Sequence, residues 1–125
     1  MNEHEPAGLV IVDDHELLAQ SLALAFSRDG IEATVLAPTS DAQIMESIES
    51  VRPAVVLLDL MLGEIGASLP LIDPIRRLGA EVVIMTGEAN PIAWAECFEA
   101  GAADVVSKSE AFGTLVERIS AIAVG

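Results

Sequence analysis

Five short apolar runs constrain the fold of this chain more than any other feature. The central run, VVLLDL at residues 55–60, has no polar residue before Asp59. Continuous Val, Ile and Leu without polar alternation are typical of strands covered on both faces, as in parallel sheets. The other four runs are LVIV at 9–12, EATVL at 32–36, EVVIM at 81–85 and DVV at 104–106. We therefore expect a sheet whose two faces are both buried.

The segments between the runs predict helices. Apolar residues recur at helical spacing from Glu16 onward, and the last helix is expected over about 111–123. Pro74 cannot lie deep inside a helix without loss of a hydrogen bond, so the third helix should start late, near Asp73, or be kinked. N-caps and glycine stops mark the other ends: Gly30, Ser40 with Gln43, Asn90 with Pro91, and Gly101. Five alternating pairs of this kind predict an α/β fold with a five-stranded, doubly wound parallel sheet.

Composition narrows the classes of protein. The 125 residues suit a single domain, with residues 1–7, including His4, expected to be frayed. A net charge of −14 argues against direct contact with nucleic acid and favours a basic protein partner or a bound cation. No apolar run approaches the roughly 20 residues that span a bilayer. The lone Cys97 excludes an internal disulfide, fits a reducing cytoplasm and is expected to be buried and inert.

Hydrophilic side chains follow four of the five runs. They are Asp13 with Asp14, Asp59, Thr86, and Ser107 with Lys108. Each alone has an ordinary explanation, such as a helix cap or a solvated lysine. Together they would meet at the carboxyl edge of a parallel sheet, where ligands bind. Because three carboxylates in one place repel one another, we expect Lys108 and a hard divalent cation, Mg²⁺, to stabilise them.

This set, at these spacings, resembles the receiver domain of two-component response regulators over about residues 9–123. The stretch VDDHELLAQSLA further resembles the subfamily with LuxR-type helix-turn-helix output domains. The resemblance implies the flavodoxin-like strand order 2-1-3-4-5 and a phosphoacceptor that is not a conventional enzyme. It also implies a histidine kinase as partner and a signal carried by the fourth helix, fifth strand and fifth helix. An output domain, attached at the C-terminus or separate, is a further expected partner.

The resemblance also assigns roles to single residues. Asp59 would accept the phosphoryl group, Thr86 would hydrogen-bond it and Lys108 would form an ion pair with it. Mg²⁺ would be held by the carboxylates of Asp14 and Asp59, by Asp13 through water, and by the backbone carbonyl of Met61. Phosphoryl transfer needs mainly positioning and charge neutralisation, which these groups could supply.

Three positions depart from the receiver pattern. Val105 occupies the place of an aromatic residue, and the chain has no tyrosine. Ser109 replaces the usual proline after the lysine, so we expect a trans bond there. Gly63 replaces a proline after Asp59. Three aromatic side chains could substitute as a switch but are expected to pack in the core: Trp94, Phe98 and Phe112.

Several alternatives stay open. One is a pseudo-receiver that serves only as a dimerisation or docking module; another is a metal-dependent phosphohydrolase, disfavoured because Met61 stands where a second acid would be needed. His15 is expected to be an ordinary helix-start residue whose side chain diverges from the acids. Leu17 and Leu24 lie off the core stripe of their helix and predict a weak homodimer through the first and fifth helices or the fourth and fifth. These residues do not distinguish a single-domain protein from the front of a longer DNA-binding regulator.

Overall fold

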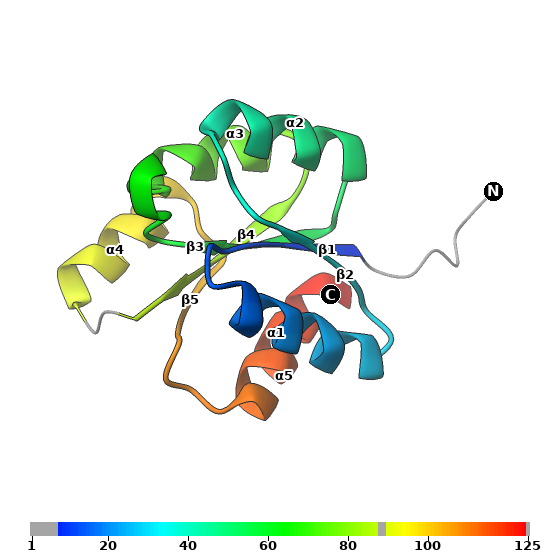
Figure 1. The fold of residues 1–125 in the computed structure, drawn as a ribbon. Helices are drawn as coiled ribbons and strands as arrows, with labels where there is room; N and C mark the ends of the chain where they lie inside the picture. The colour runs from blue at the N-terminus through cyan, green and yellow to red at the C-terminus, as the bar shows by residue number, and fades with distance from the viewer. Residues whose placement is uncertain (1–7, 88–89, 125) are drawn as a thin grey trace.

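A computed structural model describes residues 8–87 and 90–124 and shows a three-layer α/β fold (Figure 1). The five strands are β1 (Gly8–Val12), β2 (Glu32–Leu36), β3 (Val55–Asp59), β4 (Glu81–Thr86) and β5 (Asp104–Ser107). All pair in parallel, in the order β2-β1-β3-β4-β5. This confirms the predicted sheet and strand order. The expectation for residues 1–7 and His4 concerns a segment outside the described residues.

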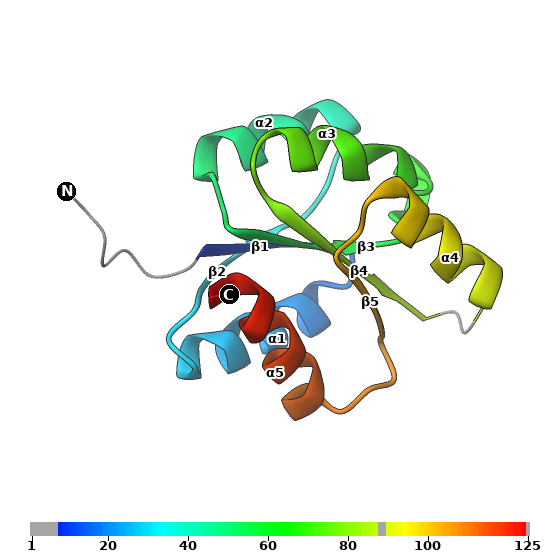
Figure 2. The same ribbon diagram turned by 180° about the vertical axis from the view of Figure 1, so that it is seen from behind.

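Helices cover both faces of the sheet. The helices α1 (Glu16–Arg28) and α5 (Phe112–Val124) lie on one face, while α2 (Asp41–Val51), α3 (Ile72–Arg77) and α4 (Pro91–Ala100) lie on the other (Figures 1 and 2). Alternate side chains of each strand enter one of two apolar cores, so β3 is buried along its whole length. Continuous apolar runs are therefore the correct signal for this sheet.

The predicted helix boundaries hold closely because local signals set them. Ser40 Oγ accepts a hydrogen bond from the Gln43 N–H at 3.1 Å, and Asn90 Oδ1 accepts one from the Ile92 N–H at 2.9 Å. Gly101 ends α4 with φ of 113°, in the region that favours glycine. In α3, Pro74 is the third residue of a short helix, which confirms the late start.

The aromatic residues follow the expectation only in part. Trp94 packs against the core beneath α4, but Phe98 and Phe112 are exposed, so the prediction that they pack in the core is wrong. Phe98 is 49% exposed on α4, and Phe112 is 39% exposed at the first residue of α5. Cys97 is buried as expected, and burial raises the pKa of its thiol. None of the described peptide bonds is cis, as predicted for Ser109.

No helix within the described residues has the length and apolar content needed to cross a bilayer.

Candidate functional site

The carboxyl ends of β1 and β3 bring three aspartates together. Val12 is the register partner of Leu58, so Asp13 and Asp59 follow on neighbouring strands at one edge of the sheet. Both are buried, whereas Asp14, one residue further into the loop, is exposed. One oxygen of each aspartate and one ring nitrogen of His15 all lie within 4.8 Å of one another. We call the cluster of Asp13, Asp14, Asp59 and Lys108 the acid pocket.

Lys108 supplies the positive charge of the acid pocket. Its Nζ lies 2.9 Å from Asp59 Oδ2 and 3.4 Å from Asp13 Oδ2. The side chain is mostly buried, with 17% of its surface exposed. Its backbone N–H donates to the carbonyl of Thr86 at 2.8 Å, which ties the loop after β5 to the end of β4. The predicted ordinary alternative, a solvated surface lysine, is therefore wrong.

Thr86 and Met61 lie at the same edge of the sheet. Thr86 is buried at the end of β4, one residue beyond Met85, which pairs with Asp59. Met61 donates its N–H to Asp59 Oδ1 at 3.4 Å. The predicted roles of the Thr86 hydroxyl and of the Met61 carbonyl stay predictions.

The acid pocket contains more negatively than positively charged groups. Burial raises the pKa of Asp59 to about 6; Lys108 opposes this shift by hydrogen bonding, and the Asp13 charge adds to it. Oδ2 of Asp13 is buried and has no hydrogen-bond donor among the described residues. Three carboxylates thus face one lysine, and their oxygen atoms are the ligands that Mg²⁺ prefers. The residues fit a divalent cation.

Gly63 gives Asp14 its space. A Cβ atom at residue 63 would lie 3.0 Å from Asp14 Oδ2, and the φ of 60° favours glycine. The departure from proline at this position therefore has a local structural reason. It lets the loop after β3 pass directly beside the pocket.

His15 is the site residue that the sequence reasoning missed. Its Nδ1 lies 3.1 Å from Asp13 Oδ1, 3.5 Å from Asp14 Oδ1 and 3.8 Å from Asp59 Oδ2. The expectation of a diverging side chain is wrong because His15 is the N-cap of α1, with φ of −87° and ψ of 85°, and does not follow helical geometry. The sequence feature that could have revealed His15 as a site residue is its position directly after two aspartates and directly before the first helix.

A second charged cluster joins the start of β5, the loop after β5 and α5. Arg118 Nη1 donates to both carboxylate oxygens of Glu110, at 2.9 and 3.0 Å, and Nη2 donates to both oxygens of Asp104, at 2.8 and 2.7 Å. Glu110 Oε1 also accepts the Ser107 N–H at 3.2 Å. We call Asp104, Glu110 and Arg118 the arginine clamp. It fixes the loop that carries Lys108.

Comparisons with known proteins agree with this geometry. The family model described as response regulator receiver domain matches residues 9–120. The sensory transduction protein RegX3 of Mycobacterium tuberculosis is 31% identical over 114 residues, which cover 91% of this chain and 49% of RegX3. The transcriptional regulatory protein CseB of Streptomyces coelicolor is 33% identical over 119 residues, 91% of this chain and 48% of CseB. The chain thus spans about half the length of these curated relatives.

Solved structures share the fold. A LuxR-family two-component response regulator from Aurantimonas sp. superposes with a TM-score of 0.83 at 26% identity, covering 97% of this chain and 87% of that one. A response regulator from Burkholderia pseudomallei, described with a phosphorylated aspartic acid, calcium ion and citrate, gives a TM-score of 0.78 at 20% identity, covering 92% and 71%. The acid pocket, the 2-1-3-4-5 sheet and the match over residues 9–120 lead to one conclusion: the chain belongs to the response regulator receiver domain family of two-component signalling.

Proposed function

We propose that this domain accepts a phosphoryl group on Asp59 from a histidine kinase in a Mg²⁺-dependent reaction. The observation that carries the proposal is the buried Asp59 carboxylate, held 2.9 Å from Lys108 Nζ beside two further aspartates. An oxygen of Asp59 would form the new bond to phosphorus as the bond to the kinase imidazole nitrogen breaks. The electron pair of the broken bond stays on that nitrogen. The product is an aspartyl phosphate.

The other residues of the site position and neutralise charge. Asp13, Asp14, Asp59 and the Met61 carbonyl would hold Mg²⁺, which when bound neutralises charge on the phosphoryl oxygens. Lys108 would exchange its contact with Asp59 for one with the phosphoryl group, and Thr86 would donate its hydroxyl. Phosphorylation adds about −1.5 to −2 charge to a pocket that already has an excess of carboxylates. This change is large enough to drive a rearrangement.

The proposed output surface is formed by α4, β5 and α5. The Lys108 N–H to Thr86 carbonyl bond links the end of β4 to the loop before α5, so movement at Thr86 reaches that loop. Ile92 and Phe98 are exposed on α4 and offer an apolar contact for a partner. Val105 is buried in β5 and has no ring that could rotate as a switch, so we expect the rearrangement to use backbone and helix shifts.

The phosphoacceptor proposal is tested by intact mass spectrometry. With acetyl phosphate and Mg²⁺, the wild-type protein should gain the mass of one phosphoryl group, and EDTA should prevent the gain. Asp59→Asn should gain none, whereas Asp41→Asn, a change of an exposed acid in the first turn of α2, should behave as wild type. An unmodified wild type under saturating donor contradicts the proposal.

The departures at Val105 and Ser109 favour a second candidate, a pseudo-receiver that docks without phosphorylation. In that case the acid pocket would have lost its ligand. Mg²⁺ titrations that are indistinguishable between wild type and Asp59→Asn would select this candidate. A clear loss of affinity in the variant excludes it.

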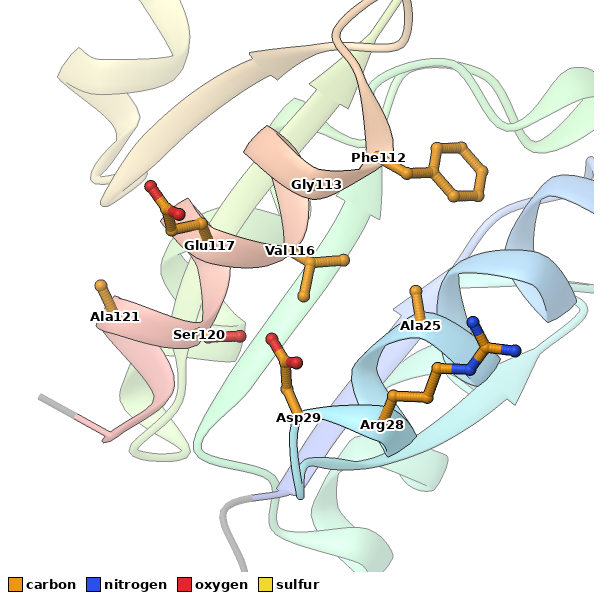
Figure 3. Close-up of a pocket in the computed structure, with 9 residues that line it drawn as sticks. All are labelled: Ala25, Arg28, Asp29, Phe112, Gly113, Val116, Glu117, Ser120 and Ala121. Atoms are coloured by element: carbon orange, nitrogen blue, oxygen red, sulfur yellow. The ribbon is translucent and has the colours of Figure 1, made fainter.

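We further propose a weak homodimer through α1 and α5. A groove of about 460 Å³ lies between these helices (Figure 3). Arg28 lines one side and Glu117 the other, so a second copy related by a two-fold axis could pair each arginine with a glutamate. Leu24, which lies four residues before Arg28 in α1, is also exposed. Light scattering that shows only monomer, with and without a phosphoryl mimic, removes this proposal.

The proposal extends to the protein around this domain. The LuxR-type resemblance of residues 12–23 and a solved LuxR-family regulator at 26% identity support a helix-turn-helix output domain. A cytoplasmic site of action is also proposed, which the single cysteine fits. Mobility-shift assays on the full-length protein, with and without acetyl phosphate, test the DNA-binding part. That this chain forms one domain of 125 residues also stays a proposal, testable by limited proteolysis.

A further inference from the structure

We propose that His15 is a nitrogen ligand of the cation site, which therefore takes a first-row transition-metal ion such as Mn²⁺, Co²⁺ or Ni²⁺ as well as Mg²⁺. The inference rests on the proposed function only in so far as both use the acid pocket. The new element is the kind of atom that binds the ion, because the carboxylates and the Met61 carbonyl offer only oxygen. An imidazole in that set changes which ions the site prefers.

The oxygens around His15 Nδ1 lie at distances close to those between ligands of one ion. Ligands bound at about 2.1 Å in an octahedron lie about 3.0 Å apart when adjacent and about 4.2 Å apart when opposite. Nδ1 lies 3.1, 3.5 and 3.8 Å from oxygens of Asp13, Asp14 and Asp59 respectively. The Asp13 distance is close to that of adjacent ligands, and the other two distances lie between the adjacent and the opposite value. One ion between the four side chains would require these side chains to adjust and Lys108 Nζ, which lies 2.9 Å from Nδ1, to move aside.

The hydrogen bonds of His15 Nδ1 depend on where the ring carries its proton. His15 Nδ1 lies 2.9 Å from Lys108 Nζ and 3.1 Å from Asp13 Oδ1, and whether it donates or accepts in each contact depends on the tautomer of the ring. In the tautomer that carries its proton on Nε2, Nδ1 has a lone pair within the pocket and can bind a cation.

Burial and backbone geometry support the same arrangement. The Asp13 side chain is fully buried; its Oδ2 has no hydrogen-bond donor among the described residues and lies 3.4 Å from Lys108 Nζ in an ion pair, so this oxygen can still accept a further bond. The His15 side chain is 66% exposed, so the pocket is accessible from solvent beside the ring. The His15 N–H donates to Asp13 Oδ1 at 2.8 Å, which fixes the backbone from which the ring extends. The imidazole is thus held in place without being buried.

Ligand chemistry predicts which ions respond. Mg²⁺ binds oxygen and gains little from imidazole, whereas Mn²⁺, Co²⁺ and Ni²⁺ bind nitrogen with increasing strength in that order. Any oxygen site also prefers Ni²⁺ to Mg²⁺, so the preference of the wild type alone proves nothing. The informative quantity is the change in preference when the imidazole is removed.

Isothermal titration calorimetry on metal-free protein measures that change. His15→Ala should weaken Ni²⁺ binding by at least about tenfold, the lower end of losses seen when the support of a metal ligand is removed. Its Mg²⁺ affinity should change by less than about twofold, because Mg²⁺ relies on oxygen ligands. His4→Ala, which removes the only other histidine, is the matched control and should bind both ions as the wild type does.

A spectroscopic measurement gives an independent readout. Cu²⁺ bound to the wild type should show nitrogen hyperfine structure in its electron paramagnetic resonance spectrum, which is retained in His4→Ala and lost in His15→Ala. Circular dichroism checks that the variant is folded. If His15→Ala weakens Mg²⁺ and Ni²⁺ equally, His15 only positions the carboxylates and the inference is overturned.

Failure of this inference and failure of the proposed function give different results. Equal Ni²⁺ affinities of wild type and His15→Ala, with Asp59 still phosphorylated in Mg²⁺, overturn the histidine ligand and leave the phosphoacceptor. A lower Ni²⁺ affinity of His15→Ala without any phosphorylation of Asp59 supports the ligand and overturns the phosphoacceptor.

Discussion

The acid pocket and the arginine clamp both gather carboxylates around one cation, but they balance charge differently. In the clamp, a single guanidinium donates to all four oxygens of Asp104 and Glu110. In the pocket, Lys108 Nζ lies within 4 Å of two aspartates while a third stands beside them. A cluster whose donors match its acceptors is complete, whereas one with spare acceptors can take a ligand. In this protein, what distinguishes a structural cluster from a binding site is whether all carboxylate oxygens have donors, and the number of acidic residues matters less.

Mg²⁺ should produce the largest difference between the two regions. At an Mg²⁺ concentration about 100 times the dissociation constant, binding to the folded state alone adds about 2.7 kcal/mol to the free energy of unfolding. Asp13→Asn should lose most of this gain, whereas Arg118→Met should keep all of it. Urea unfolding with Mg²⁺ and with EDTA measures both. An equal response of the two variants would mean that the acid pocket and the arginine clamp do not differ in their ability to bind a cation.

Asp59→Asn should stabilise the metal-free protein at neutral pH by up to about 3 kcal/mol, the free energy that corresponds to a pKa shift of this size. The pKa of Asp59 is about 6 in the folded protein against an ordinary value of 3.8, so folding takes up a proton between these values. The stability of the wild type relative to the variant therefore falls as pH rises through this window and then levels off. Urea unfolding in EDTA at pH 5, 6, 7 and 8 tests this. A constant difference, or a less stable variant at pH 8, contradicts it.

Arg118→Met should destabilise the protein by about 1–2 kcal/mol, because two partly buried carboxylates lose their guanidinium donor and each keeps only a backbone N–H. The loss should be the same with and without Mg²⁺. Asp104→Asn combined with Arg118→Met should cost less than the sum of the two single changes, since both remove one interaction. Thermal or urea unfolding of the three variants completes this cycle, and additive losses would show that the clamp contributes no coupling.

The smallest effect is expected on α3, where Arg77 Nη2 lies 2.9 Å from Asp73 Oδ2 in an exposed ion pair. Arg77→Gln should change the free energy of unfolding by less than about 0.5 kcal/mol, as is usual for surface pairs. This variant provides the baseline for the clamp. A loss as large as that of Arg118→Met would mean that burial of the carboxylates is not what strengthens the clamp.

Most of the fold could be predicted because its signals are local. The runs at β1, β3 and β4 encode burial on both faces, and Ser40, Asn90 and Gly101 mark helix ends through bonds to their own neighbours. The gathering of Asp13, Asp59 and Lys108 could also be predicted, because parallel strands present their carboxyl ends at one edge.

The missed features depend on conformation or on distant partners. His15 enters the pocket through the non-helical backbone of an N-cap, which a helical-wheel argument cannot describe. The clamp joins Asp104 and Arg118, which are 14 residues apart, and either could have been a solvated charge. The loop from Gly63 to Leu71 forms two short 3-10 turns whose shape depends on positive φ at Gly63 and Gly66. Phe98 and Phe112 show that an aromatic residue on a helix is no guarantee of burial.

The course of α1 connects the two surfaces assigned to this domain. The helix starts directly after His15 at the cation site and ends at Arg28, which lines the groove between α1 and α5. Its 13 residues make a rod about 20 Å long. If cation binding tilted α1 about His15, the displacement would increase along the helix. Occupancy of the cation site would then move Arg28 at the other end.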